Sequence, residues 1–372
     1  MHYHILLTER CNSECKYCYE KSLKDAELEN NLGKKFKFDF SEPDSSLVDI
    51  QKLKRFLSKD KDAVLVFYGG EPLLEIVKIK QIIDSINIPF RMQTNGKLLG
   101  KLPIDYLKKI DRILVSIDGN KERTDYNKGE GTYDAVVKNV RQARKNGYKG
   151  EIVARMTISP EADAYDLYEQ VLHLLSLGIF DSIHWQIDAG FYKFDYDREK
   201  FSKFAEEYNK SVSRLIDYWI QEMKKGRVLR LYPFIAMIDS LLKNEKTKLR
   251  CGAGHLGYAI TTNGKIVACP IMNCIEDFKA GTINDNPKSL LKFEIPGCSK
   301  CDYKDLCGGR CLYWRAAKLW PKEGNDLICK TIKHYIDELK RKLPEIKELI
   351  KEGKINASDF NYEKYFGPEI IP

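Results

Sequence analysis

Three cysteines lie within eight residues near the N-terminus, in the run TERCNSECKYCYE at positions 8–20. Cys11, Cys15 and Cys18 are spaced as C-x3-C-x2-C and directly follow an apolar run that predicts a strand. Thiols in this pattern could form disulfides, bind zinc or bind an iron–sulfur cluster. Zinc usually takes four ligands from paired C-x2-C units or nearby histidines, and no fourth ligand lies close in the sequence. A cluster held by three thiolates would leave one iron open to a substrate or cofactor.

The other eight of the eleven cysteines lie between residues 251 and 329. Their spacing is C-x12-G-x4-C over 251–269 and C-x2-C-x5-C-x3-C-x17-C over 298–329, with Cys274 outside both patterns. The run YAITTNGKIVAC predicts a β-hairpin whose Asn263-Gly264 pair suits a tight type I′ turn. For the pair Cys298 and Cys301, taken without the other cysteines, a zinc ribbon is an alternative to an iron–sulfur cluster.

Composition narrows the choice of chemistry. The chain has 372 residues, of which 43% are hydrophobic and 31% charged, enough for a packed core. Its net charge of +8 is spread along the chain among interleaved acids, which indicates a solvated surface and makes a nucleic-acid partner unlikely. No signal peptide and no apolar run of about 20 residues is visible, so we expect a cytoplasmic protein without membrane segments. Thiols stay reduced in that compartment, which favours metal ligation over disulfides.

The elements that must position these cysteines alternate between strands and helices. Six β-branched or apolar runs predict strands at 2–7, 63–68, 90–94, 112–117, 151–158 and 182–188. Helices are predicted at 132–146, which Gly147 would cap, at about 197–225, and at about 331–353. Six βα units fall short of the eight that close a barrel, so the expected fold is α/β, a partial (β/α)6 TIM-like barrel. Its chemistry would lie at the carboxyl ends of the strands.

The motifs at these strand ends carry a family resemblance. The cysteine run, FYGGEP at 67–72, MQTNG at 92–96 and SIDG at 116–119 together resemble radical S-adenosylmethionine (AdoMet) enzymes. The resemblance implies that Cys11, Cys15 and Cys18 hold a [4Fe–4S] cluster whose open iron chelates AdoMet. Gly69 and Gly70 would let the backbone approach a ligand. The AdoMet contacts that it implies are Tyr17, Gly69, Gly70, Glu71, Thr94, Asn95, Ser116, Lys128, Arg155 and Ile187.

Two of these contacts are alternatives. The family often carries an arginine toward the AdoMet carboxylate in the segment that reads RTDYNKGEGTYDAVVKNV here. This chain has Lys128 in that segment. The AdoMet carboxylate would therefore be bound either by Lys128, a point charge in place of the arginine, or by Arg155 on the fifth strand. Ile187 would line the adenine site, or pack in the core.

The later cysteines resemble the SPASM domain, a C-terminal extension of radical AdoMet enzymes with two auxiliary iron–sulfur clusters. By this resemblance Cys298, Cys301, Cys307 and Cys329 hold one cluster, and Cys251, Cys269 and Cys311 hold the other. Cys274 either completes the second cluster or leaves one iron open. The expected domains are a radical AdoMet partial barrel at 1–230, a SPASM domain at 231–335 and a helical tail at 336–372.

The resemblance implies an oxidoreductase that cleaves AdoMet to a 5′-deoxyadenosyl radical and abstracts hydrogen from a peptide or protein. Maturation of a ribosomally made peptide is the favoured reading. The sulfatase-maturing branch typically has Asp after the second SPASM cysteine, where this chain has Pro270. The expected partner besides the substrate is an electron donor such as ferredoxin or flavodoxin. A precursor peptide would be recognised by the barrel, by the tail or by a separate peptide-recognition protein. The alternatives are an enzyme acting on a small molecule or RNA, or a non-catalytic electron-transfer protein. The sequence does not identify a catalytic acid or base.

Overall fold

The computed structural model describes residues 1–18, 35–159, 166–188, 196–318 and 320–365. Its contacts divide the chain into two compact units, each built from two stretches of sequence. The first unit comprises 1–155 and 252–294, and the second comprises 156–251 and 295–372. The predicted domains, with boundaries after 230 and 335, divide the chain differently and remain a prediction.

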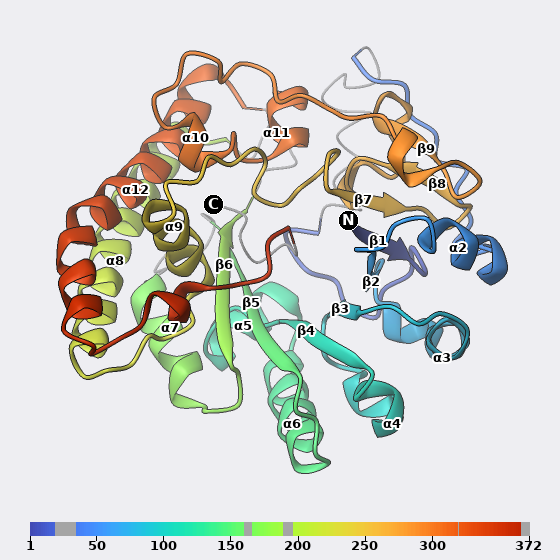
Figure 1. Cartoon of the computed structure of the whole chain (residues 1–372), viewed down its shortest axis with the longest axis horizontal. Coiled ribbons are helices and arrows are strands. Elements are labelled where there is room, and N and C mark those ends of the chain that lie inside the picture. Colours follow the sequence, from blue (N-terminus) through green and yellow to red (C-terminus); the bar gives the residue numbers. More distant parts are fainter. Residues whose placement is uncertain (19–34, 160–165, 189–195, 319, 366–372) are drawn as a thin grey trace. The chain divides into compact units, whose positions relative to one another are not determined.

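The first unit is built on a twisted sheet whose strand order is β5-β4-β3-β2-β1-β7-β8-β9 (Figure 1). Neighbours from β1 to β5 are parallel, and β1 is also parallel to β7. Because β1 has β2 and β7 as its two neighbours, the parallel strands do not close into a barrel. The strands are β1 (His2–Leu6), β2 (Val64–Tyr68), β3 (Phe90–Thr94), β4 (Ile110–Ser116), β5 (Glu151–Ile158), β7 (Gly257–Ile260), β8 (Lys265–Val267) and β9 (Lys279–Thr282).

Helices connect the parallel strands, as the alternating sequence pattern predicts. Asp49 caps α2 by accepting a hydrogen bond from the Lys52 amide (2.8 Å). The apolar stripe predicted at 132–146 is the buried face of α6, and Gly147 follows it with a left-handed φ of 86°. The helices of this unit are α2 (Ile50–Leu57), α3 (Ile76–Ser85), α4 (Ile104–Leu107), α5 (Lys121–Lys128) and α6 (Thr132–Lys145).

The hairpin of β7 and β8 is present, but its turn differs from the predicted type I′ turn. The Gly264 amide donates to the Thr261 carbonyl (3.0 Å), and the Thr261 amide donates to Lys265 (2.9 Å). Gly264 has a left-handed φ of 89°, whereas Asn263 is not among the left-handed residues. A type I′ turn needs positive φ at both central residues, so the loop is instead a turn over 261–264 that ends in a left-handed glycine.

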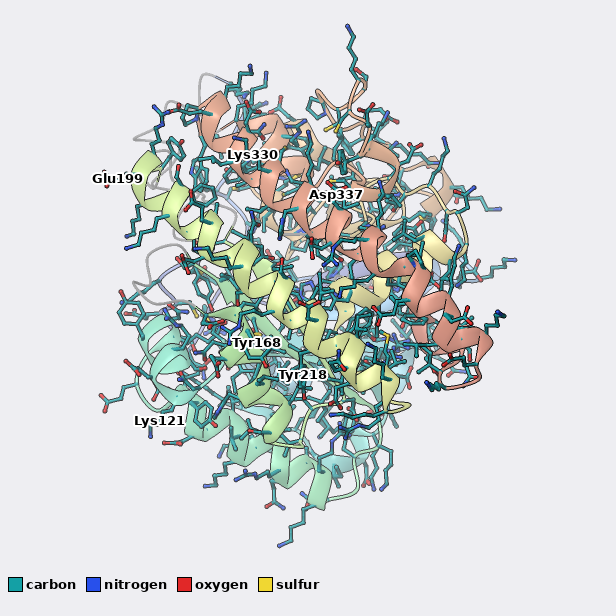
Figure 2. All side chains as sticks on the ribbon, turned by 90° about the vertical axis from the view of Figure 1, so that its left-hand side faces the viewer. Lys121, Tyr168, Glu199, Tyr218, Lys330 and Asp337 are labelled. Atoms are coloured by element: carbon teal, nitrogen blue, oxygen red, sulfur yellow. The ribbon has the colours of Figure 1, made fainter. Side chains whose placement is uncertain are left out.

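The second unit contains the end of β5 and the long helices α8 and α12, which pack against each other, with α7 against α8 and α9 against α12. Its β6 lies next to the end of β5, where the Asp188 amide donates to the Ile158 carbonyl (2.8 Å). Figure 2 shows α8 and α12 running side by side. Lys342 pairs with Asp217 between them (2.6 Å). The elements are β6 (Ser182–Ile187), α7 (Leu167–Ser176), α8 (Arg198–Lys224), α9 (Tyr232–Leu242), α10 (Lys304–Cys307), α11 (Leu312–Ala317) and α12 (Lys322–Lys351).

The helix predicted at about 331–353 is longer than expected, because α12 begins at Lys322, nine residues before position 331. Within the described residues, none of the helices is both long and apolar enough to cross a membrane.

Candidate active site

The three-cysteine run forms a loop that leaves the carboxyl end of β1. The Cys18 amide donates to the Cys15 carbonyl (3.2 Å), which turns the last two thiols back on each other. Cys11 is exposed as a residue, yet desolvation still raises the pKa of its thiol to about 11, with smaller contributions from Glu71 and Cys15. The protein environment thus disfavours the charged thiolate form of Cys11. This is expected of a metal ligand, because bound iron would balance the negative charge of the thiolate.

The donor type at this loop is the one that an iron–sulfur cluster requires. All three donors are soft thiols, the type that iron–sulfur clusters use. The assignment of these cysteines as ligands remains a proposal.

The glycines of GGEP bring β2 against the cysteine loop itself. The Gly70 amide donates to the Thr8 carbonyl (2.8 Å), and the Glu71 amide donates to the Arg10 carbonyl (2.9 Å). A β-carbon on Gly69 would lie 2.4 Å from the Thr8 oxygen, and one on Gly70 would lie 2.3 Å from the Arg10 oxygen. The close approach that the glycines allow is therefore to the chain's own backbone, whereas the sequence analysis expected an approach to a ligand.

Gly69→Ala is expected to destabilise the protein by about 2 kcal/mol more than Gly129→Ala. Both glycines have positive φ, at 136° and 98°, so alanine is strained at each. Only Gly69 is crowded, because nothing lies within 4 Å of a β-carbon on Gly129. Chemical denaturation of the two variants measures the difference. Equal losses of stability would show that the contact with the cysteine loop does not constrain Gly69.

Glu71 is fully buried and connects β2 with the end of β3. Its carboxylate accepts hydrogen bonds from the Thr94 hydroxyl (2.7 Å), the Asn95 amide (2.8 Å) and the Leu73 amide (3.0 Å). Burial raises the pKa of this carboxyl, and the three donors oppose that shift. Three internal donors already engage the anionic acceptor that the sequence analysis assigned to AdoMet. Any cofactor contact of Glu71 would therefore share its oxygens with them.

Asn95 carries the connection onward to the cysteine loop. Its side-chain amide donates to Asn12 (2.7 Å) and Ser13 (3.3 Å) and lies 3.8 Å from the Cys11 sulfur. Its carbonyl oxygen accepts from the Lys97 amide (3.0 Å). The second and third strand-end motifs thus hold the first half of the loop in place.

The fourth motif holds the second half of the loop through Tyr17. Its hydroxyl donates to Asp118 of SIDG (2.5 Å), which also accepts from the Asn127 side chain (3.0 Å). Lys128 lies 4.0 Å from the other Asp118 oxygen and 5.0 Å from the centre of the Tyr17 ring. The Asp118 and Lys128 side chains are only 0% and 5% exposed, so they form a buried ion pair. The lysine that the sequence analysis offered to the AdoMet carboxylate thus already has an anionic partner.

One face of the parallel strands carries a row of partly exposed polar side chains, although the opposite face is apolar. Leu6 is in register with Tyr68, and Ser116 is in register with Arg155. Alternation along each strand places five side chains on this face, which we call the inner row: His4, Tyr68, Gln93, Ser116 and Arg155. On the other face, Tyr3 is fully buried and its ring packs 5.3 Å from Phe56 of α2.

Three members of the inner row, His4, Tyr68 and Gln93, are absent from the predicted site. The predicted Ser116 and Arg155 lie on neighbouring strands beside each other, which suits the two as partners for one anionic group. A signal for His4 exists in the sequence. The run His-Tyr-His-Ile places a polar histidine at every second position, whereas a strand with helices on both faces is normally a continuous apolar run.

His4 gives the inner row a measurable pH dependence. Burial, with help from the charge of His2, lowers its pKa to about 3, and its ring packs against Tyr68 (5.6 Å between centroids). An unfolded histidine titrates near pH 6.5, so the unfolded chain binds one more proton between about pH 3 and 6.5. Stability from neutral His4 is therefore present above pH 6.5 and falls as the solution is acidified.

His4→Gln is accordingly expected to remove about one proton, or about 1.4 kcal/mol per pH unit near pH 5, from the pH dependence of unfolding. Urea titrations at pH 4.5, 5.5 and 8 compare the variant with the unmodified protein. The value at pH 8 is the control, because His4 is neutral in both states there. Identical slopes would show that His4 takes up a proton in the folded protein.

In the second unit, two of the four cysteines predicted to bind one auxiliary cluster lie within electrostatic range of a third, Cys307. Cys307 of α10 lies within electrostatic range of Cys298 and of Cys329 on α12. Cys251 and Cys311 belong to this unit too, whereas Cys269 and the buried Cys274 belong to the first, so the other ligand set stays a prediction. Ile187 is buried in β6, and its contact with adenine also stays a prediction.

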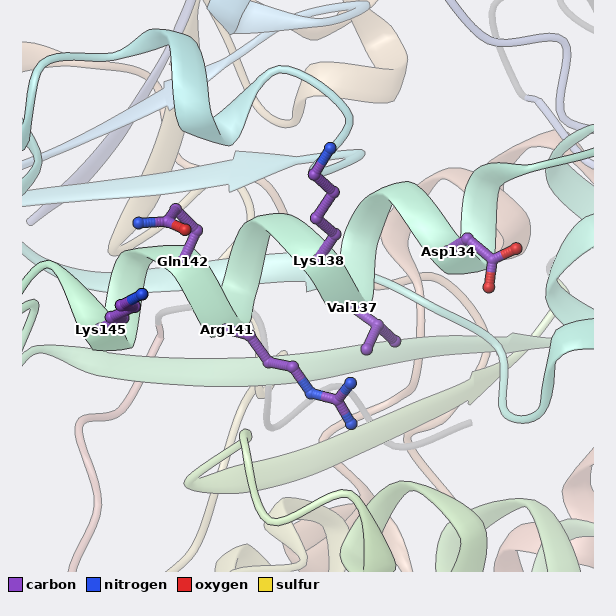
Figure 3. Close-up of a pocket in the computed structure, with 6 residues that line it drawn as sticks. All are labelled: Asp134, Val137, Lys138, Arg141, Gln142 and Lys145. Atoms are coloured by element: carbon purple, nitrogen blue, oxygen red, sulfur yellow. The ribbon is translucent and has the colours of Figure 1, made fainter.

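A surface groove of about 370 Å³ lies apart from these motifs in sequence. All six residues that line it come from α6 (Figure 3). Lys138, Arg141 and Lys145 make it basic, but none of its residues is a predicted site residue. It is the solvated side of an amphipathic helix, so we assign it no role.

An unclosed α/β sheet with strand-end motifs that contact a three-cysteine loop is the arrangement that the sequence analysis expected of an AdoMet-dependent radical protein. The sequence model of the Radical SAM superfamily matches residues 5–171. Over these residues the chain is similar to the radical SAM superfamily, and the predicted partial barrel with a SPASM-type extension is confirmed as a fold.

Relatives and solved structures agree with this placement. An uncharacterized protein of Archaeoglobus fulgidus is 24% identical over 324 residues, 82% of this chain and 72% of that protein. The radical SAM cyclopropyl synthase TigE of Paramaledivibacter caminithermalis is 22% identical over 333 residues, 83% of this chain and 67% of that protein. The structure of native anSMEcpe with bound AdoMet and Cp18Cys peptide has a TM-score of 0.70 and 16% identity, covering 94% of this chain and 99% of that chain.

These findings support the coarser functional predictions. The match over residues 5–171 and the fold agree with a radical SAM enzyme, a class whose cofactors are AdoMet and [4Fe–4S] clusters. The residues that bind them and the substrate on which the enzyme acts are matters of proposal.

Proposed function

We propose that the protein is a radical SAM oxidoreductase that abstracts hydrogen from a peptide or protein substrate. In this proposal the product is an oxidatively modified or crosslinked peptide. Cys11, Cys15 and Cys18 would hold the cluster at the end of β1. When bound and reduced, that cluster supplies the electron that cleaves AdoMet and releases the 5′-deoxyadenosyl radical.

The protein's own residues would fix where that chemistry happens. Backbone bonds from GGEP, the Asn95 amide and the Tyr17–Asp118 hydrogen bond hold the cysteine loop from three strand ends. A loop held at several points keeps its thiols and the bound cofactor in one geometry. Ser116 and Arg155 are in register on the inner row, where they would bind the AdoMet carboxylate.

The observation that carries the proposal is the inner row itself. A parallel strand between helices is normally buried on both faces, yet five strand positions here present polar side chains that stay partly exposed. Such a face offers hydrogen-bond partners to a polar, extended substrate such as a peptide backbone. The anSMEcpe structures with bound peptide support this reading by analogy of fold.

Transfer of deuterium from a peptide to the cofactor tests the proposal. Synthetic peptides encoded by short reading frames next to the gene, made with fully deuterated residues, are incubated anaerobically with the reconstituted enzyme, AdoMet and dithionite. Mass spectrometry of 5′-deoxyadenosine reads out the transfer. We expect one deuterium in 5′-deoxyadenosine and a peptide that is lighter than its precursor.

Two outcomes separate this proposal from the alternatives. Deuterium that appears only with deuterated small metabolites or with RNA would replace the peptide by those substrates. Absence of 5′-deoxyadenosine from protein with full clusters would leave electron transfer as the function.

An Arg155→Gln variant should raise the KM for AdoMet more than it lowers kcat, because the inner row would act in binding.

A further inference from the structure

A pair of arginines lies within the second unit beside the four cysteines predicted to hold an auxiliary cluster. Cys298 and Cys301 are joined by a turn in which the Cys301 amide donates to the Cys298 carbonyl (3.2 Å). Cys307 ends α10, and Cys329 lies in the second turn of α12. Arg310 follows Cys307 by three residues.

One of the two guanidinium groups contacts a thiol of this set, and the other lies within electrostatic range of two more. A terminal nitrogen of Arg315 lies 2.6 Å from the Cys298 sulfur and donates to the Gly297 carbonyl (3.2 Å). Arg310 is 8% exposed and lies within electrostatic range of Cys307 and Cys329. Two positive charges are thus held where four thiolates would meet.

Asn325 fixes both arginines in place. Its side-chain oxygen accepts from Arg310 (2.6 Å) and from Arg315 (3.1 Å). Asn325 stands four residues before Cys329 on α12, so the two lie on the same face of that helix. The arginines and one of the cysteines are therefore oriented by a single helical turn.

Neither arginine has a carboxylate partner in the part of the chain that the structure describes. Their side-chain hydrogen bonds there go to the neutral Asn325 and Gly297 and to the Cys298 sulfur. The Arg315 Nε is also buried without a hydrogen-bond partner among the described residues. Buried cations need an anion nearby, and a four-thiolate cluster, whose net charge is negative, would supply one.

The backbone at Arg310 indicates that its side chain is needed. Arg310 has φ of 67°, in the left-handed region, directly after the left-handed Gly308 and Gly309. A side chain in that conformation costs about 1 kcal/mol that glycine would avoid. Strain of this kind is kept where the side chain has a function.

We propose that Arg310 and Arg315 raise the reduction potential of the auxiliary cluster bound by Cys298, Cys301, Cys307 and Cys329, so that it is a better electron acceptor. The inference rests on the ligand set of the proposed function. One-electron reduction adds one negative charge to the cluster, and nearby buried cations stabilise the reduced form more than the oxidised form. The N–H contact to the Cys298 sulfur acts in the same direction.

The test is a redox titration of the full chain followed by electron paramagnetic resonance. Cys11, Cys15 and Cys18 are replaced by alanine in every sample, so that the cluster bound to AdoMet does not contribute a signal. Arg310→Gln and Arg315→Gln are each expected to lower the reduced-to-oxidised ratio of one auxiliary signal about tenfold at a fixed potential, which is about 59 mV for one electron. For Arg315→Gln the signal of the other auxiliary cluster should not move and serves as an internal reference. Arg310 also lies within electrostatic range of Cys311, which is predicted to bind that other cluster, so Arg310→Gln should shift the second signal as well, by a smaller amount.

Conservative and remote variants complete the design. Arg310→Lys and Arg315→Lys keep the charge and should restore most of the ratio, and both Arg310 variants keep the same left-handed backbone. Arg341→Gln, which removes an exposed arginine paired with Glu338 on α12, should leave both signals unchanged. Full iron content with unshifted potentials in both Gln variants would overturn the inference. If the chain with only Cys11, Cys15 and Cys18 replaced contains less iron than two [4Fe–4S] clusters need, the predicted ligand set on which the inference rests is wrong.

Discussion

Cys15→Ala is expected to abolish formation of 5′-deoxyadenosine and to remove about four iron atoms per chain. Cys15 is the central thiol of the loop, and its carbonyl receives the Cys18 amide (3.2 Å). Two thiolates cannot hold a cubane with one open iron, so the loss should exceed 1,000-fold, on the order of 4 kcal/mol or more in activation free energy. Mass spectrometry of the nucleoside and iron analysis of the reconstituted protein measure the two effects.

Ser13→Ala is the matched control within the same loop. Ser13 lies between two cysteines and accepts a long hydrogen bond from the Asn95 side chain (3.3 Å), which also has Asn12 as a closer partner (2.7 Å). We expect this variant to keep its iron and to lose no more than about fivefold in activity, since one neutral hydrogen bond contributes about 1 kcal/mol. Full iron content in Cys15→Ala would contradict the assignment of this thiol as a ligand.

The sequence was sufficient to predict the elements around the site, because each relies on a local signal. The strands at 90–94 and 151–158 have the predicted bounds, three others differ by one residue at one end, and the strand predicted at 112–117 differs by two residues at its start and one at its end. GGEP, TNG and SIDG stand at strand ends as predicted, since a parallel sheet brings the carboxyl ends of its strands to one edge.

What the sequence did not predict depends on contacts between distant residues. Nothing local says that Asp118 will meet Tyr17 about 100 positions earlier, or that Lys128 will be buried beside it. From the sequence alone, the glycines of GGEP are interpreted as allowing a ligand to approach the backbone. In the fold, the backbone of the cysteine loop occupies the space beside them. The turn at Asn263-Gly264 was predicted wrongly because the same two residues suit a type I′ turn and a longer loop closed by a left-handed glycine.

The positions of the inner row could have been derived from strand alternation, but its significance could not. Polar residues at every second position also describe a sheet with one face in water. The register of the successive strands from β1 to β5 shows that these side chains share one face of the sheet, and the other face is buried.

Breaking the ion pair beneath Tyr17 is expected to have the largest effect on stability of any single change around the site. Asp118→Leu leaves Lys128 as a buried charge without its partner, at a cost of about 3–5 kcal/mol. It also removes the acceptor of the Tyr17 hydroxyl (2.5 Å), so the second half of the cysteine loop loses its anchor. We therefore expect weaker AdoMet binding as well as a lower free energy of unfolding, measured by calorimetry and by urea denaturation.

A double-mutant cycle separates the two effects. Lys128→Met in the Asp118→Leu background removes the unpaired charge and should recover at least about 2 kcal/mol of stability. It should not recover AdoMet affinity, because the hydrogen bond between Tyr17 and position 118 is still absent. Tyr17→Phe alone, which keeps the ion pair, should weaken AdoMet binding with a stability loss of only about 1 kcal/mol. If the double variant regains both properties, Asp118 acts on the loop through charge, and the hydroxyl of Tyr17 has no part in holding it.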